Sequence, residues 1–186
     1  IPDSTYLEKC KSKIRGVFIT HGHLDHIGAI PYIIPKLGNP PIYTRLLTSV
    51  MIKKRQAEFP HLPKLRLEVV EKDSRLKIGK YLSVRFFNVT HTIPDAMGII
   101  IETPYGNIIF TGDIKVDHDN GIPVEKELET FGKLNKENNL LLLSDSTNVE
   151  RPGYSFSERA VHENLRKIIA DVKGRLIMGT FASLLE

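Results

Sequence analysis

The sequence predicts a mixed α/β domain in which helices pack in layers against β-sheets. Short apolar runs recur along the chain and are typical of strands, while three longer segments have the apolar spacing of helices. Some of the expected strands are joined by tight turns and others by helices, which favours a layered α/β arrangement. The 186 residues are 41% hydrophobic, which suffices for one domain with a core.

The first half of the chain predicts strands and helices that alternate. Pro31 is compatible with a helix because it falls in the first turn, and Gly38–Pro41 ends that helix. The residues of the following helix that we expect to face a core are Leu47, Val50, Met51 and Ala57. The elements expected in chain order are a strand over Arg15–Thr20, a helix over Gly28–Leu37, a strand over Pro41–Tyr43 and a helix over Thr44–Phe59.

The second half predicts mainly strands. Pro104-Tyr105-Gly106 lies between two apolar runs and indicates a hairpin. Ser155 and Glu158 form a capping box ahead of a helix that we expect to end at Gly174. The apolar residues at helical spacing in that helix are Val161, Leu165, Ile168, Ile169 and Val172. The expected strands are Leu67–Val70, Leu82–Val89, Ile99–Glu102, Asn107–Phe110, Leu140–Leu143 and Arg175–Met178.

Composition excludes some classes of protein. No apolar run approaches the roughly 20 residues that cross a bilayer, and we expect neither a signal segment nor a membrane partner. The one cysteine, Cys10, excludes an internal disulfide and fits a reducing compartment, so we expect a cytoplasmic protein. The net charge of +4 permits a polyanionic partner without indicating one, because the basic residues are scattered.

Residues 21–26 carry the strongest chemical signal, because three histidines and one aspartate follow a predicted strand within six positions. Neutral imidazole and carboxylate are the ligands that zinc and similar metals accept at catalytic sites. Gly22 lacks a Cβ where the backbone is expected to bend sharply, so side chains on both sides of it can turn inward. The pairs His21 with His23 and Asp25 with His26 fit two metal ions better than one.

Two other predicted strands also end at a possible ligand. His91 follows the strand Leu82–Val89, and Asp113 follows the strand Asn107–Phe110. Functional residues of layered folds gather at strand ends, where a rigid scaffold positions them. Each residue alone is a weak signal, but beside the histidine-rich turn both become candidate ligands.

The order of these motifs, His-x-His-x-Asp-His followed by a lone His and then Gly-Asp, resembles the metallo-β-lactamase fold family. Longer segments resemble the ribonuclease J group of β-CASP nucleases. These segments are Phe18–Ala29, His91–Asp95, Thr111–Lys115, Ser144–Asn148, Glu150–Gly153 and Thr180–Ser183. The resemblance implies an αββα sandwich, of which residues 1–186 would form a partial metallo-β-lactamase domain ending where a β-CASP domain would begin. We therefore expect the N-terminal strands, the β-CASP insertion and the C-terminal return of the family to lie outside this chain.

The resemblance also implies a site with two divalent metal ions, zinc first and manganese as the alternative. His21, His23 and His91 would bind one ion, Asp25 and His26 the second, and Asp113 would bridge them. A hydroxide held between the ions would attack phosphorus. The residues with implied catalytic roles are Asp25, His26, Asp113 and Asp145. Asp145 matches the first acidic β-CASP motif, although a turn carboxylate in Ser-Asp-Ser-Thr is the alternative. The second metal would lack a histidine that the return segment carries.

The resemblance implies a metal-dependent ribonuclease that hydrolyses RNA phosphodiesters. Its expected action is that of a 5′-to-3′ exonuclease, with endonuclease action as a second mode. The full-length protein would be a homo-oligomer, and the piece alone would cleave RNA weakly. One alternative is a hydrolase of thioesters or lactones, and another is a non-catalytic RNA-binding or assembly module. Four further residues are weaker candidates. His118 could contact substrate or metal, Asp95 could orient the ligands, and Lys115 and Arg151 could contact phosphates; for each of them a surface role is the alternative.

Overall fold

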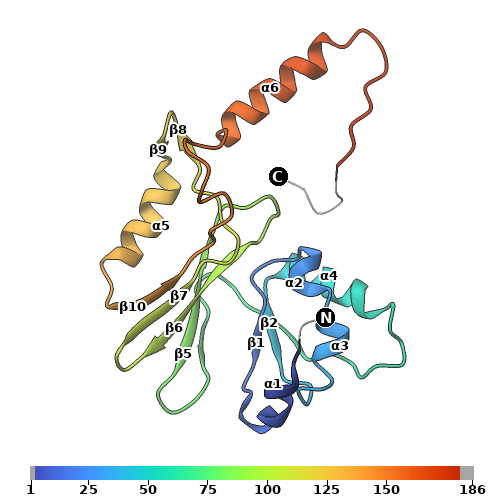
Figure 1. The fold of residues 1–186 in the computed structure, drawn as a ribbon, viewed down its shortest axis with the longest axis vertical. Coiled ribbons are helices and arrows are strands. Elements are labelled where there is room, and N and C mark those ends of the chain that lie inside the picture. The colour runs from blue at the N-terminus through green and yellow to red at the C-terminus, as the bar shows by residue number, and fades with distance from the viewer. Residues whose placement is uncertain (1–2, 181–186) are drawn as a thin grey trace.

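The computed structural model describes residues 3–180 and has two facing β-sheets between layers of helices (Figure 1). Helices α2, α3 and α4 cover the outer face of the smaller sheet, and α5 covers the outer face of the larger one (Figure 1). The predicted mixed α/β class and the helix–sheet–sheet–helix order are confirmed. Residues 1, 2 and 181–186, which include most of the predicted Thr180–Ser183 motif, lie outside the described part.

The smaller sheet is parallel and has the strand order β1-β2-β3. Its strands alternate with short helices because apolar residues on the helices must cover one face of the sheet. Ile42 of the central strand packs with Ile27, Ile30 and Ile52 of those helices in one buried cluster. The elements of this half are α1 (Thr5–Lys9), a 3₁₀ turn (Lys11–Lys13), β1 (Val17–Phe18), α2 (Leu24–Ile27), α3 (Ile30–Ile33), β2 (Ile42–Thr44), α4 (Leu46–Gln56) and β3 (Leu67–Val69).

The larger sheet has the order β10-β7-β6-β5-β4, with β10 parallel to β7 and the other pairs antiparallel. The predicted hairpin at Tyr105 is confirmed, because β6 and β7 pair across it with Ile100 opposite Ile109. The elements of this half are β4 (Arg75–Lys77), β5 (Ser83–Asn88), β6 (Met97–Thr103), β7 (Gly106–Phe110), β8 (His118–Asp119), β9 (Ile122–Pro123), α5 (Glu125–Asn135), β10 (Asn139–Leu143) and α6 (Glu158–Asp171).

Strand β5 shows why the larger sheet is covered on both faces. Successive side chains of a strand point to opposite faces, and both Phe86 and Phe87 are buried. Phe86 packs between the sheets, where Phe18 of β1 joins its cluster. Phe87 packs on the other face with Leu134 of α5. The sheet is therefore fixed against a partner on each side, and the loops at its strand ends have a rigid base.

Three sequence predictions about local structure are wrong. The strand expected over Arg175–Met178 is irregular chain, because no neighbouring strand pairs with it in the described residues. Helix α6 is capped by Ser157, whose side chain accepts from the Ala160 N–H, and not by Ser155. Helix α4 buries Thr48, Ser49 and Ile52, whereas the predicted core residues Val50 and Ala57 are exposed.

Other predictions hold with changed bounds. The helix expected over Gly28–Leu37 is observed as the shorter helix α3, and a further short helix that was not predicted, α2, precedes it within the histidine-rich turn. The strand β4 was not predicted, because its alternating charged residues give it little apolar character. Within residues 3–180, no helix is both long enough and apolar enough to cross a bilayer.

Candidate metal centre

Three loops bring the predicted ligands together at one end of the two sheets. His21 and His23 lie between the end of β1 and the start of α2, with Asp25 and His26 in the first turn of that helix. His91 follows β5 and Asp113 follows β7, and all three strands end at the upper end of the sheets in Figure 1. The backbone N–H of Met97 donates to Thr20 O at 3.0 Å, which ties the first loop to the larger sheet.

The first ligand group consists of three histidines. His23 Nδ1 lies 3.0 Å from His21 Nε2 and also 3.0 Å from His91 Nε2. Two nitrogens bound about 2.0–2.1 Å from one tetrahedral zinc would lie roughly 3.3–3.4 Å apart. The observed spacing is close to that value, and His23 Nε2 on the opposite side of the ring is buried without a hydrogen-bond partner. The group is therefore compatible with one metal ion.

The second ligand group consists of His21, His26 and Asp113. Asp113 Oδ2 lies 3.4 Å from His26 Nε2, and it lies 3.9 Å from both His21 Nε2 and His91 Nε2. One carboxylate thus reaches both groups. Asp25 differs from the other predicted ligands, because its side chain is 77% exposed and its oxygen Oδ2 lies 3.3 Å from His26 Nε2 at the edge of the group.

The electrostatics of the centre keep two of its histidines neutral. Burial lowers the pKa of His21 most, and the neighbouring His26, His91 and His23 lower it further, to about 3. Burial and then His23 also lower the pKa of His91. Thr20 Oγ1 lies 3.0 Å from His21 Nδ1, so a hydrogen on Nδ1 has an acceptor and the Nε2 lone pair is free for a cation. Both rings are in the ligand form at neutral pH.

Two glycines allow the loops to come this close. Gly112 has a φ of +63°, and a Cβ there would lie 2.9 Å from the Thr20 Cβ. Gly22 has no left-handed backbone; a Cβ on it would instead lie 2.6 Å from Met51 Sδ. The sharp bend predicted at Gly22 is not observed, and the missing Cβ instead leaves room for the Met51 side chain of α4.

Asp145 braces the loop that carries Asp113. Its Oδ2 accepts from the Ile114 N–H at 3.2 Å, and its Oδ1 accepts from the Thr147 N–H at 2.7 Å. Burial raises the pKa of Asp145, but the hydrogen bonds from Thr147 and Ile114 outweigh it, so the net change is downward. The turn role that the sequence offered as an alternative is thus present, next to the candidate ligands.

The weaker candidates take structural positions. Asp95 Oδ2 accepts from the Leu47 N–H at 3.2 Å, at the start of α4, and so it holds a helix end and not a histidine ring. His118 accepts from the Gly121 N–H through Nδ1 and lies 2.8 Å from Ser155 O through Nε2, which ties the β8–β9 hairpin to the segment before α6. The Lys115 ammonium pairs with Glu158. Arg151 is exposed, and its contact with phosphate stays a prediction.

The sequence did not single out Glu127, which is buried beside the loop that carries His91. It lies in the first turn of α5 and accepts from the Thr90 hydroxyl, next to His91. An acidic residue in a first turn is ordinarily explained by the helix dipole, so the sequence carried no signal that singled it out.

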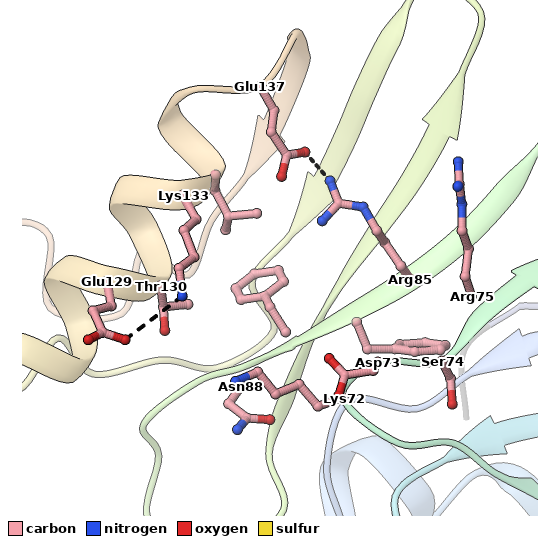
Figure 2. Close-up of a pocket in the computed structure, with 13 residues that line it drawn as sticks. Lys72, Asp73, Ser74, Arg75, Arg85, Asn88, Glu129, Thr130, Lys133 and Glu137 are labelled. Carbon is pink, nitrogen blue, oxygen red and sulfur yellow. Dashed lines mark hydrogen bonds and ion pairs between the residues drawn. The ribbon is translucent and has the colours of Figure 1, made fainter.

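A pocket of about 370 Å³ between α5 and strands β4 and β5 lies apart from this centre (Figure 2). None of the predicted ligands lines it. Four basic side chains do, but their charges are largely neutralised. Arg85 pairs with Glu102 and Glu137, and Lys133 pairs with Glu129, as the dashed lines in Figure 2 show for two of these contacts. The pocket therefore gives little support to a phosphate site.

A smaller cavity of about 240 Å³ opens directly beside the second ligand group. His26 and Gly112 line it on the side of the centre, and aromatic side chains of both sheets line part of the remainder. The aromatic residues are Phe18 and Phe110, and the rest of the lining consists of Ile19, Thr20 and Ile99. The cavity gives the His26 side of the centre an open approach.

The chain matches the sequence profile described as "Metallo-beta-lactamase superfamily" over residues 6–179. It is 36% identical to Ribonuclease J 2 of Staphylococcus aureus over 183 residues, and 37% identical to Ribonuclease J of Thermus thermophilus over 191 aligned positions. Each alignment covers 98% of this chain and 32% or 33% of the relative. The chain thus spans about a third of the length of these curated relatives.

A solved structure shows the same fold at much lower sequence identity. The MIM-2 Metallo-Beta-Lactamase superposes with a TM-score of 0.53 over 87% of this chain and 72% of that one, with 12% identity. At that identity the likeness concerns the fold alone, and the two sheets between helical layers are what the proteins share.

Proposed function

Because the chain belongs to the metallo-β-lactamase superfamily, we propose that it is the metal-holding part of a ribonuclease J-like enzyme that hydrolyses RNA phosphodiesters. The observation that carries the proposal is the position of Asp113, whose Oδ2 lies within 3.4–3.9 Å of histidines in both ligand groups. Such a shared carboxylate suits two metal ions, and two ions suit the attacking and leaving oxygens of a phosphoryl transfer.

In this proposal His21, His23 and His91 hold one ion, and Asp25 and His26 hold the other, with Asp113 shared. Divalent ions bound there would lower the pKa of a bound water and neutralise charge on the phosphoryl oxygens. Zinc suits the imidazole ligands best, and manganese is the alternative. The exposed Asp25 supports weaker binding of the second ion, because its carboxylate contacts the group only through His26.

The residues of the chain itself have distinct tasks. His21 and His91 present neutral rings, because their pKa values are lowered and neither has to release a proton at pH 7. Asp145 fixes the backbone at Ile114, and so it holds the loop on which Asp113 sits. Its acidic group is also the candidate support for a histidine supplied by the longer protein, as the resemblance implies.

The substrate assignment comes from the relatives, which are named as ribonucleases. We propose 5′-to-3′ exonuclease action on RNA in the longer protein, with endonuclease action as a second mode. A β-CASP domain would follow these residues in that protein, which would be a cytoplasmic homo-oligomer. The net charge of +4 is compatible with a polyanionic substrate.

The test measures metal content and hydrolysis together. The chain is purified without chelators, its zinc and manganese are quantified by mass spectrometry, and cleavage is assayed on 5′-monophosphorylated RNA and on a small thioester. Bound metal with RNA cleavage, weak in this chain and strong in the longer protein, supports the proposal. Thioester turnover without RNA cleavage would replace it with the alternative hydrolase, and the absence of metal would favour a non-catalytic module.

A further inference from the structure

Glu127 is a buried carboxylate that lies outside both ligand groups. It is 3% exposed and sits in the first turn of α5, on the outer face of the larger sheet. A buried carboxylate is costly unless hydrogen bonds compensate for the loss of water. Its Oε1 accepts from Thr90 Oγ1 at 2.5 Å. The contact is therefore a specific one, and its partner is the residue that precedes the candidate ligand His91.

Helix capping does not account for Glu127. An acidic residue at this helix position often accepts from the N–H of the N-cap residue. Here the N-cap is Val124, and its N–H donates to Asp117 O at 3.1 Å. The Glu127 side chain instead reaches away from its helix to the loop after β5.

The direction of the hydrogen bond follows from the neighbouring lysine. Lys126 Nζ lies 3.3 Å from Thr90 Oγ1, and an ammonium group can only donate. The Thr90 hydroxyl therefore accepts from Lys126 and donates its own hydrogen to Glu127. With both roles of the hydroxyl assigned, the Thr90 side chain has one favoured orientation.

Thr90 is also the point at which two ligand loops meet. Its carbonyl oxygen accepts from the Lys115 N–H at 2.8 Å, two residues after Asp113. Thr90 itself is adjacent in sequence to His91. A displacement of Thr90 would therefore move a ligand of the first group and the carboxylate shared by both groups.

We propose that Glu127 is a positioning residue for the metal centre, which acts through the Thr90 hydroxyl to hold the His91 loop and the Asp113 loop at ligand spacing. The inference rests on the proposed metal-holding function and adds a residue to it. Groups that orient metal ligands typically change metal affinity by 10–100-fold when they are removed. Glu127 differs from such groups because it contacts Thr90, the residue that precedes the ligand His91, and not the imidazole ring itself.

The experiment separates positioning from simple anchoring of α5. Thr90→Val and Glu127→Met each remove one partner and leave the other buried without it, so both variants are expected to lose thermal stability. The double variant removes both polar partners, so most of its stability should return. Glu129→Met, on the exposed side of the same helix, is the matched control. Thr90→Ser and Glu127→Gln keep the hydroxyl and an acceptor oxygen.

Three quantities are measured on every variant: Zn²⁺ affinity by chelator competition, the visible spectrum of the Co²⁺-loaded chain, and the His91 imidazole NMR signals of the metal-free chain. We expect both single variants and the double variant to bind Zn²⁺ roughly 10-fold or more weakly, with altered spectra and a shifted or broadened His91 signal. Thr90→Ser, Glu127→Gln and Glu129→Met should stay near the unsubstituted chain.

The outcomes are distinct. If the double variant regains Zn²⁺ affinity together with stability, Glu127 only anchors its helix and the inference is overturned. Equal Zn²⁺ affinity in all variants overturns it as well, while the metal centre stands. If the unsubstituted chain binds neither Zn²⁺ nor Co²⁺, the metal centre is overturned and this inference with it.

Discussion

Gly112 and Thr20 meet where the loops after β7 and β1 converge, so closely that a Cβ on Gly112 would lie 2.9 Å from the Thr20 Cβ. Gly112 also has a φ of +63°, a conformation that side chains with a Cβ disfavour. The two residues precede Asp113 and His21. The contact therefore sets the distance between the shared carboxylate and the buried histidine.

Gly112→Ala should destabilise the chain and weaken metal binding. The left-handed backbone alone costs about 1–2 kcal/mol for alanine, and the contact with Thr20 adds a steric cost. We expect a free energy of unfolding lower by about 2 kcal/mol or more, measured by urea denaturation, together with reduced Zn²⁺ affinity.

Gly132→Ala is the matched control for that change. Gly132 lies inside α5, where a Cβ would meet nothing within 4 Å. Alanine in a helix interior is more favourable than glycine by roughly 0.5–1 kcal/mol. This variant should therefore gain stability and keep its Zn²⁺ affinity, and a loss in both glycine variants would contradict the explanation from the Gly112–Thr20 contact.

His91→Ala, His26→Ala and Asp113→Ala should remove different parts of the metal centre. His91 belongs to the first group alone, His26 to the second, and Asp113 reaches both. We expect His91→Ala and Asp113→Ala to abolish RNA cleavage by the longer protein while the fold survives, and Asp113→Ala to lower the affinity for both ions. Metal content and circular dichroism check this.

The exposed His162 on α6 supplies the control for those variants. His162→Ala removes one imidazole far from the centre in sequence and should change neither metal content nor cleavage. Near-normal cleavage by His91→Ala or Asp113→Ala would refute the ligand assignment.

The sequence could single out the candidate ligands because their signal is local, and their binding of metal stays a prediction. Three histidines and an aspartate within six positions after a strand are rarely explained by packing, and the segments before His91 and Asp113 are rich in apolar residues. The fold was predictable for the same reason: Phe86 and Phe87 bury opposite faces of β5, and the turn at Tyr105 joins two apolar strands.

The features that the sequence did not predict depend on hydrogen-bond and packing partners that apolar spacing does not reveal. In α4 the polar Ser49 is buried, with its hydroxyl donating to Leu46 O, and apolar spacing does not count such compensated polar residues. The apolar segment at Ile177 forms no strand because nothing pairs with it among the described residues. Glu127 looks like an ordinary first-turn acid until Thr90 is found beside it.

The stability of the metal-free chain should fall on acidification because of His21. The pKa of His21 is about 3 in the fold, against 6.5 when it is not perturbed, so the unfolded chain binds more protons between these values. The contribution of neutral His21 to stability is fully present above pH 6.5. It is lost as the pH falls toward 3, by up to about 1.4 kcal/mol per pH unit. The lowered pKa of His91 acts in the same direction.

Urea denaturation of the metal-free chain at pH 7 and pH 5 measures this effect. We expect a loss of roughly 2 kcal/mol between the two values, and a smaller loss in His21→Asn, which lacks the titrating ring. The comparison uses the slopes and not the absolute stabilities, because the substitution itself changes packing. A slope unchanged in His21→Asn would show that His21 is not the cause.

Asp145→Asn tests whether a charged acceptor holds the Asp113 loop. Asparagine keeps one acceptor oxygen, so one of the hydrogen bonds from Ile114 and Thr147 is lost and the other weakens. We expect the free energy of unfolding to fall by about 1–2 kcal/mol and Zn²⁺ binding to weaken.

Because the folded pKa of Asp145 lies below 3.8, the contribution of its charge to stability is present above pH 3.8 and is lost as the pH falls further. The stability gap to the unsubstituted chain should therefore stay constant from pH 8 to 5 and narrow progressively as the pH falls below 3.8. Asp171→Asn, at the exposed end of α6, should show no gap at any pH. A gap that does not narrow at all as the pH falls below 3.8 would mean that shape at residue 145, and not its charge, supports the loop.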